Sequence, residues 1–309
     1  MAVMKKKEKD HIPLLAKFWL RLYHVVPKVK FPGSDLDWGF TIASMCFFYS
    51  TRLMLQQVLH SYGWPVNSLI TKQAAASLQG GLFHSPNLVA VAFVLMRSVS
   101  KYNPAAAQND HPQWWQDVAD AIIQLCTGHM LCDTIAGIFV DNYVPGQGFN
   151  FGDETVLFLA HHTISLLYLI STRVLRAGHQ SMLMCFLLGE TTNPTFSAYL
   201  VCQSAKTLEC CSGPLATNII RVVELVNAIV YIPFRAIIGP IVGAHMSYNI
   251  LCSDSARTNI PIYIRLLWTA ILWIIAIASI PYVITFMEQF KTHMEFMMTA
   301  AAADVQQEL

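Results

Sequence analysis

Long apolar segments alternate with short polar ones along almost the whole chain. A segment of about 20 mainly apolar residues is long enough to cross a bilayer as a helix. Seven segments fit this description, near Trp38–Leu59, Ala74–Val99, Val118–Val140, Thr155–Val174, Gln180–Cys202, Leu215–Ile250 and Ile262–Met287. The pattern therefore predicts an all-α fold, a polytopic transmembrane helical bundle of about seven spans.

The sixth of these segments is too long for a simple span. At about 1.5 Å per residue it exceeds the thickness of the hydrocarbon layer by a wide margin. It also contains Pro233 and Pro240, and proline in a helix interior removes a backbone hydrogen bond. We expect a kinked, strongly tilted or broken helix here, with two short helices as the alternative.

The first thirty residues differ from the rest. After the cationic run MKKKEKD, apolar Leu15, Phe18, Trp19 and Leu22 recur at helical spacing beside basic residues, which predicts a surface helix over residues 12–26. Charges interrupt the apolar run, so a cleaved signal peptide is not expected. We divide the chain into a cationic segment with this helix (1–36), a first span and loop (37–71), the main membrane domain (72–290) and a C-terminal tail (291–309).

The composition supports the membrane interpretation and argues against a nucleic-acid-binding or zinc-binding protein. Hydrophobic residues make up 54% of the chain and charged residues 13%, and the mean hydropathy is +0.44. The net charge is +1, and no basic patch with interleaved aromatics lies beyond the first thirty residues, so nucleic acid is not expected as a partner. The cysteines show no zinc spacing, so no metal is expected. Membrane lipids are the expected partners, and the distribution of Lys and Arg places the N-terminus in the cytosol.

Several polar residues interrupt the predicted spans. His129 and Asp133 are four residues apart, hence on one helix face, where a carboxylate can fix the tautomer of an imidazole. His161 and His162 point about 100° apart on a helix, so they do not easily share one target. Glu190 is followed by Thr191, Thr192, Asn193 and Pro194, and Arg235 lies between the two prolines of the sixth span.

Each of these residues can also be interpreted as having a structural role and no part in a functional site. The histidines could join helices by hydrogen bonds, and Glu190 could simply neutralise Arg235. Ionisable groups in a span are costly, however, and their occurrence on four successive spans favours one shared internal site. If so, Glu190 and Arg235 should lie within reach of a salt bridge or of one bridging water. At least one of His161 and His162 should then face the same cavity as Asp133.

The order of these elements resembles the TLC domain shared by TRAM, Lag1 and CLN8 proteins. The resemblance is carried by SLQGG in the second span, GHMLCD in the third, HHTISLLYL in the fourth, GETTNPTF in the fifth and the late Arg235. It implies a protein of the endoplasmic reticulum or a related endomembrane, with six core helices in a barrel-like bundle around a lipid-accessible cavity.

The chain also departs from the best-known members of that family. In ceramide synthases an HDxxD element follows the histidine pair, whereas here CFLLGETTNP stands in its place. Gln79 occupies a position where many relatives have histidine, and His129 one where an aromatic residue is more usual. The sequence is more similar to small TLC-domain proteins that influence membrane lipid composition.

These residues leave three functions open. The first is acyl transfer in lipid metabolism, with acyl-CoA as a candidate co-substrate and no cofactor; its catalytic group would be His161, His162, Asp133 and Glu190. The second is a lipid sensor, binder or transporter in membrane lipid homeostasis. The third is an intramembrane hydrolase with a metal on His129, Asp133, His161 and Glu190. Substrate-binding roles are assigned to His129, Arg235, Thr191, Thr192 and Gln79, with Arg235 binding an anionic headgroup or an acyl-CoA phosphate. A homo-oligomer is compatible with all three.

Overall fold

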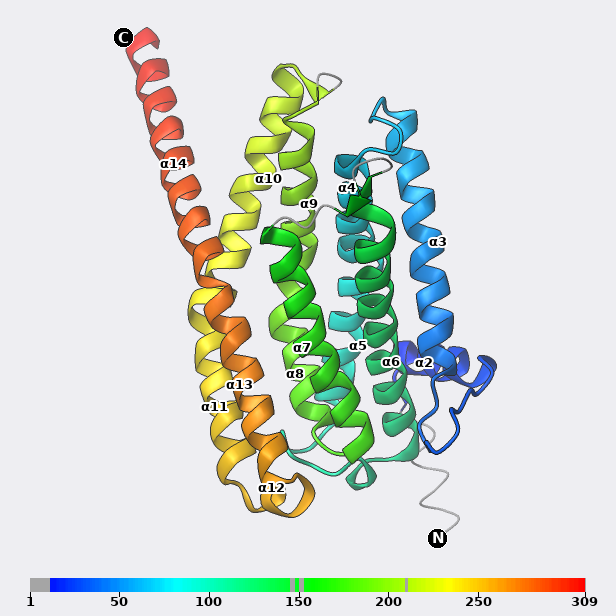
Figure 1. Cartoon of the computed structure of the whole chain (residues 1–309). Coiled ribbons are helices and arrows are strands. Elements are labelled where there is room, and N and C mark those ends of the chain that lie inside the picture. Colours follow the sequence, from blue (N-terminus) through cyan, green and yellow to red (C-terminus); the bar gives the residue numbers. More distant parts are fainter. Residues whose placement is uncertain (1–11, 145–147, 150–152, 209–210, 309) are drawn as a thin grey trace.

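A computed structural model describes residues 12–144, 148–149, 153–208 and 211–308. Its helices lie side by side in one bundle, with α2 at one end and the last helix leaving the opposite end (Figure 1). The cationic run MKKKEKD lies outside the described residues.

The elements follow one another in this order. The first half comprises α2 (Leu14–Val25), α3 (Gly39–Ser61), α4 (Leu69–Gln79), η1 (Gly80–His84), α5 (Ser85–Arg97), η2 (Gln108–Asp110), α6 (Gln113–Ala136), η3 (Gly137–Asp141) and a two-residue antiparallel pair, β1 (Tyr143–Val144) with β2 (Gly148–Phe149). The second half comprises α7 (Asp153–Leu175), α8 (His179–Gly189), η4 (Glu190–Thr192), α9 (Asn193–Ala205), α10 (Pro214–Ile232), η6 (Pro233–Ile238), α11 (Gly239–Cys252), α12 (Asp254–Asn259), α13 (Ile262–Ala278) and α14 (Ile280–Glu308).

All seven predicted spans fall on helices, and the all-α polytopic bundle is confirmed. Five helices among the described residues are long and apolar enough to cross a membrane: Leu69–Arg97, Gln113–Asp141, Phe158–Leu175, Pro214–Cys252 and Ile262–Glu295. The first and fifth predicted spans correspond to α3 and to α8–η4–α9, which are not among these five. The protein is therefore an integral multi-pass membrane protein, and the count of seven crossings stays a prediction.

The long sixth segment is one continuous helix rather than two short ones. It runs from Pro214 to Cys252, and its middle turns form the π-helical segment η6 at Pro233. Proline removes an i to i−4 bond, and a wider π turn accommodates the loss without ending the helix. Two further π segments, η1 and η3, extend α4 and α6. Such segments are frequent at functional sites, and each of the three contains an ionisable side chain: His84, Asp141 or Arg235.

Small residues allow close helix packing around the bundle centre. A Cβ atom added to Gly81 would lie 2.7 Å from the Cβ atom of Ser197 on α9, and one added to Gly128 would lie 2.6 Å from the backbone oxygen of Thr41 on α3. Both distances are too short for any larger side chain. Glycine at these two positions therefore brings η1 against α9 and α6 against α3, as is typical of helices in membranes.

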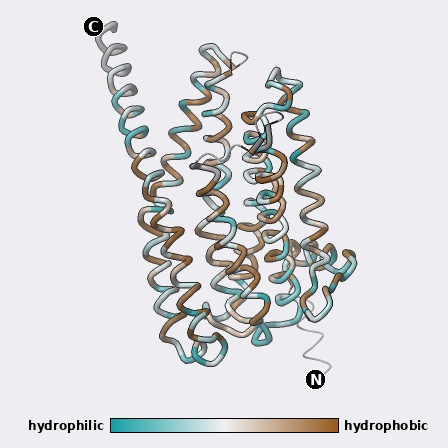
Figure 2. Tube along the Cα trace, viewed as in Figure 1, coloured by the Kyte–Doolittle hydropathy of each residue, from teal (hydrophilic) through white to brown (hydrophobic). Residues whose placement is uncertain are grey.

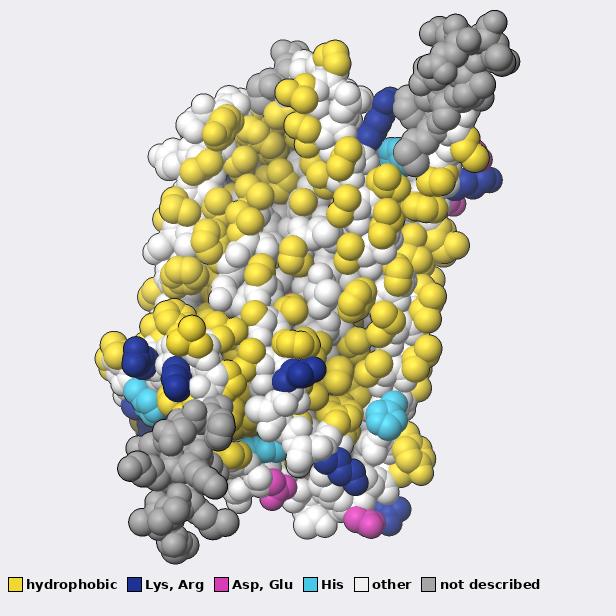
Figure 3. Space-filling view, turned by 180° about the vertical axis from the view of Figure 1, so that it is seen from behind, with side chains coloured by type: hydrophobic (Ala, Val, Ile, Leu, Met, Phe, Trp, Pro, Cys, Tyr) yellow, Lys and Arg dark blue, Asp and Glu magenta, His cyan; other side chains and the backbone are white. Residues whose placement is uncertain are grey.

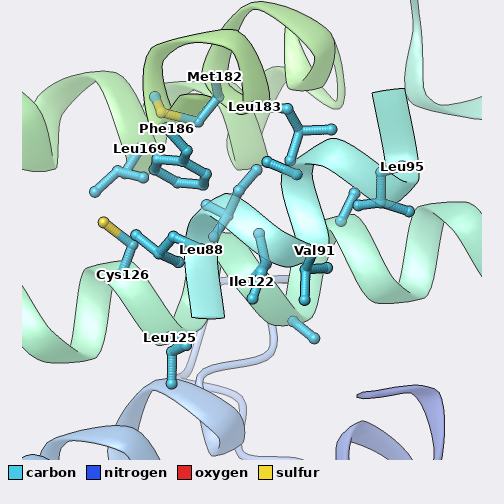
Figure 4. Close-up of a cluster of buried hydrophobic side chains, with 14 of the residues drawn as sticks. Leu88, Val91, Leu95, Ile122, Leu125, Cys126, Leu169, Met182, Leu183 and Phe186 are labelled. Carbon is cyan, nitrogen blue, oxygen red and sulfur yellow. The ribbon is translucent and has the colours of Figure 1, made fainter. Parts of the chain in front are cut away.

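The main hydrophobic core lies between α5, α6, α7 and α8. Leu88, Val91, Ile122, Leu169 and Leu183 are almost fully buried there and interdigitate from the four helices (Figure 4). Many large hydrophobic side chains are also exposed on the bundle. Hydrophobic positions run along the length of the helices (Figure 2). The space-filling view shows the same arrangement, with Lys and Arg near both ends of a hydrophobic middle (Figure 3).

Helix α2 packs across one end of the bundle. Trp19 is buried in the main core, and the Tyr23 hydroxyl donates to Asp120 of α6 at 2.8 Å. The opposite carboxylate oxygen of Asp120 accepts from Nε of Arg173 on α7 at 2.7 Å. Leu14 and Phe18 remain exposed, at 85% and 58%. The amphipathic helix is thus present, and its location on a membrane surface stays a prediction.

Candidate functional site

Two adjoining cavities lie in the middle of the bundle. The larger one, about 180 Å³, is lined mainly by apolar residues of α7, α8, α11 and α13. The smaller one, about 70 Å³, is lined mainly by polar residues of η1, α6, α7 and α9. Four residues line both: Met130, His161, Glu190 and Asn193. An apolar compartment therefore meets a polar one at the level of His161 and Glu190.

Two stacked imidazoles form one wall of the polar pocket. The rings of His84 and His129 lie 3.8 Å apart between centroids, inclined by 30°, and Phe48 packs against both. His84 Nδ1 is 3.5 Å from Oε2 of Glu190. The other nitrogen of His84, Nε2, and Nδ1 of His129 are buried without a hydrogen-bond partner among the described residues. Both histidines therefore line the pocket, and each has one buried ring nitrogen without a described partner.

Glu190 occupies the interruption of the fifth predicted span. Its Oε2 atom accepts hydrogen bonds from the Ser85 hydroxyl at 2.6 Å and from the Asn193 amide at 2.8 Å. The 3₁₀ turn η4, at residues 190–192, brings Glu190 and Asn193 together at the junction of the two cavities. The carboxylate is thus held by neutral donors and one imidazole.

Asp133 lies behind the polar pocket rather than in its wall. Its Oδ2 atom is 3.5 Å from Nε2 of His129, so the two share a helix face as predicted. Its Oδ1 atom accepts from Nη1 of Arg52 at 3.1 Å, and Nη2 of Arg52 bonds to Asp141. All three charged side chains are nearly fully buried. The expectation that Asp133 faces a cavity shared with His161 or His162 is therefore wrong, because Arg52 on α3 holds it outside both.

The two adjacent histidines of α7 both line the polar pocket. His162 is buried, with Nδ1 3.5 Å from the Thr134 hydroxyl of α6 and its ring 3.9 Å from that of Phe158. His161 is exposed on the bundle, lines the apolar cavity as well, and forms no hydrogen bond with a described residue. The two rings are 5.8 Å apart. His162 is thus fixed by packing, while His161 is free to contact a ligand.

Arg235 projects from the π segment η6 into the wall of the apolar cavity. Its Nη2 donates to the Gly189 carbonyl at 2.8 Å, and Nε and Nη2 both lie 3.2 Å from the Thr192 hydroxyl. Among the described residues Arg235 and Glu190 form no direct ion pair, although both line the apolar cavity, and a contact through one bridging water stays a prediction. No direct pair forms because Glu190 turns toward Ser85 while the carbonyl and hydroxyl of η4 occupy the guanidinium.

The remaining predicted site residues form hydrogen bonds to backbone carbonyls or to Arg235. Thr191 donates to the carbonyl of Leu187 in its own helix at 2.6 Å, and Gln79 donates to the carbonyl of Phe48 on α3 at 2.6 Å. Thr192 is fully buried against Arg235. None of these three lines either cavity, so their role in substrate binding has no contact to support it and stays a prediction.

Three residues of the site were not recognised in the sequence. His84 lies one π turn beyond Gln79 and places a histidine in the pocket from the same helix, and Ser85 follows it. Arg52 supplies the counter-charge of Asp133. The polar run FHSPN in the second apolar segment was a usable signal for His84. Nothing local pairs Arg52 with Asp133, because the contact joins residues 81 apart in the chain.

The four residues considered as ligands of a metal ion do not form a metal site. Within the part of the chain that the structure describes, no group of three or more His, Cys, Asp or Glu side chains is arranged to hold a metal ion. Asp133 instead contacts His129 and Arg52, whereas Glu190 contacts His84 and Ser85.

Comparison with known proteins agrees with the fold and the order of the motifs. The family model described as TLC domain matches residues 38–287, a range that includes α3, which the sequence analysis placed before the domain. No curated protein and no solved structure matches the chain. A match over most of the length shows the family, and the chain belongs to the TLC domain family of membrane proteins with lipid-related functions.

Proposed function

We propose that this protein binds a membrane lipid in the paired cavities and thereby acts in lipid metabolism or membrane lipid homeostasis, in the endoplasmic reticulum or a related endomembrane. The observation that carries the proposal is the junction at His161, Glu190 and Asn193, where an apolar cavity of about 180 Å³ opens into a polar pocket. A lipid has the same division into an apolar chain and a polar group.

The polar lining of the smaller pocket, with His84, His129 and Glu190, supports a polar occupant. Buried polar atoms almost always have hydrogen-bond partners, and His84 Nε2 and His129 Nδ1 have none within the described chain. A pocket of about 70 Å³ has room for water or for the polar group of a lipid. The apolar cavity next to it holds an acyl chain among Met182, Phe186 and Leu272.

Filling the apolar cavity with a side chain tests the proposal. Gly243 lines the cavity, and a Cβ atom added to it meets nothing within 4 Å, so Gly243→Leu adds an apolar side chain at the cavity wall where its first atom has open space. Gly137 is equally unobstructed but lines neither cavity, and Gly137→Leu is the matched control. We expect the lipid that copurifies with the protein, measured by mass spectrometry, to be lost from the first variant and kept by the second. Equal lipid content in both would reject lipid binding in this cavity.

Acyl transfer is the second candidate function. It is favoured by His161, which lies at the junction of the two cavities and forms no hydrogen bond with a described residue. In this reaction a lipid hydroxyl or amine attacks the carbonyl carbon of a bound acyl thioester, and His161 takes the proton of the attacking group. A new acyl bond forms, the carbon–sulfur bond breaks, and the departing thiolate receives the proton from His161. Acyl-CoA is the proposed donor. Asp133 contacts His129 and so would act on the pocket through that imidazole.

A double variant separates acyl transfer from binding alone. His161→Ala with His162→Ala removes both imidazoles of α7 while leaving the His84–His129 stack and Glu190 in place. Transfer of a labelled acyl group to lipid acceptors should fall by about 100-fold or more, the usual contribution of a general base. Lipid copurification should persist. A folded double variant with undiminished transfer would reject His161 and His162 as catalytic residues, whereas no transfer by the native protein from any donor tested would leave lipid binding as its function.

A further inference from the structure

Arg235 is half-buried and differs from the buried arginines Arg52 and Arg173 in the charge of its partners. Arg52 contacts two carboxylates, and Arg173 contacts Asp120. Arg235 donates only to the Gly189 carbonyl and the Thr192 hydroxyl among the described residues, with its guanidinium carbon 5.4 Å from the centre of the Tyr231 ring. All three partners are neutral. The positive charge of Arg235 is therefore not balanced by a direct contact with an acidic side chain of the described chain.

The position of Arg235 along its helix makes this imbalance important. It lies 21 residues after Pro214 and 17 residues before Cys252 on one continuous helix, or about 32 Å and about 26 Å from the two ends of that helix. Arginine is charged in proteins. A charge inside a membrane-spanning helix is costly unless it is paired. Arg265 also donates to a neutral carbonyl, but it lies only three residues from the start of its helix.

Glu190 lines the same cavity as Arg235 and is a candidate for its counter-charge, but it already accepts other hydrogen bonds. Its Oε2 atom is held by Ser85 and Asn193 and faces His84 on the side of the polar pocket. The cavity wall next to Arg235 includes apolar Phe234, Pro240 and Ile275. An occupant of this cavity therefore meets a cation that has no acidic partner, in a wall that is mainly apolar.

From these contacts we infer that the lipid bound in the cavity is an anionic amphiphile with a small head, a carboxylate or a phosphate monoester, and that Arg235 binds this head. The inference rests on the proposed lipid binding and does not depend on acyl transfer. Apolar walls select for an acyl chain, and the guanidinium fork matches carboxylate and phosphate oxygens in two parallel hydrogen bonds. A cavity of about 180 Å³ leaves little room for a large head group beside the chain. A nucleotide-bearing donor such as acyl-CoA does not meet this description at Arg235.

Three ligands with the same sixteen-carbon chain test the inference: palmitate, hexadecyl phosphate and hexadecanol. Equilibrium binding is measured on the purified full-length protein in neutral nanodiscs, at a pH where both acids are ionised. The native protein should bind at least one of the anions about 10- to 100-fold more tightly than the alcohol, as expected for a hydrogen-bonded charge. The preferred anion identifies the head as carboxylate or phosphate.

Variants of two arginines assign the preference to Arg235. Arg235→Gln should reduce anion affinity to that of hexadecanol and leave hexadecanol binding unchanged, and Arg235→Lys should keep part of the preference because it keeps the charge. Arg265→Gln, the matched control outside the cavity, should behave like the native protein. Equal binding of the alcohol and both anions, or a preference that survives in Arg235→Gln, would overturn the inference while leaving lipid binding intact. Binding of none of the three ligands would overturn the proposed function and this inference together.

Discussion

Removing Arg52 should destabilise the protein far more than removing its partner Asp133. Arg52 lies between Asp133 and Asp141, and the exposed fractions of the three side chains are 5%, 7% and 5%. Replacing Arg52 with methionine leaves two buried carboxylates without their cation, for which a loss of about 3–5 kcal/mol is expected. Asp133→Asn still leaves Arg52 paired one to one with Asp141. It weakens one charge-assisted hydrogen bond, which costs about 1–3 kcal/mol.

Unfolding of the two variants in mixed micelles with increasing denaturing detergent, followed by tryptophan fluorescence, measures this difference. The triple variant Arg52→Met, Asp133→Asn, Asp141→Asn removes all three charges and should recover much of the stability that Arg52→Met loses, because no unpaired charge remains. If Asp133→Asn proved as destabilising as Arg52→Met, or the triple variant no better than Arg52→Met, the charge balance assigned to this cluster would be wrong.

Three further changes test other parts of the structure. Gly81→Val should cost about 1–3 kcal/mol by overpacking against Ser197, whereas Gly137→Val, with open space around it, should not, as thermal unfolding midpoints will show. Ser85→Ala should cost about 1–3 kcal/mol because Glu190 loses a buried donor, and an unchanged midpoint would contradict that hydrogen bond. Burial acts to raise the pKa of Asp37, in the loop before α3, but backbone hydrogen bonds and Lys28 outweigh it and lower the pKa below 3.8. The folded state therefore binds fewer protons than the unfolded state near this pH. The difference in unfolding free energy between the native protein and Asp37→Asn should be largest above about pH 4 and should shrink as the pH falls below 3.8. A difference that does not change with pH would count against this assignment.

The fold was predictable because its signal is local. Each apolar segment is long enough to identify a membrane helix by itself, and every predicted span falls on a helix. The shape of the sixth segment was less predictable, because the same prolines are compatible with a break or with a π segment. Only the packing around η6 decides between them. The family resemblance was confirmed for the same reason as the fold, since it depends on the order of motifs along the chain.

The site was predictable in some of its members but not in its pairings. His161, His162, His129 and Glu190 all line the polar pocket, and each was visible as a polar interruption of a span. Their partners come from helices far apart in the sequence. Glu190 turned out to face Ser85 rather than Arg235, since geometry between helices decides which of several oppositely charged or polar groups meet.

Photo-crosslinking of a lipid in place tests the central claim, lipid binding in the paired cavities, most directly. A fatty acid with a photoreactive group in its chain is equilibrated with the protein in nanodiscs, irradiated, and the labelled residues are identified by mass spectrometry. The account predicts labels on cavity residues such as Met182, Phe186 and Leu272, and their loss in Gly243→Leu but not in Gly137→Leu. Labels confined to the outer surface of the bundle, equal in both variants, would contradict it.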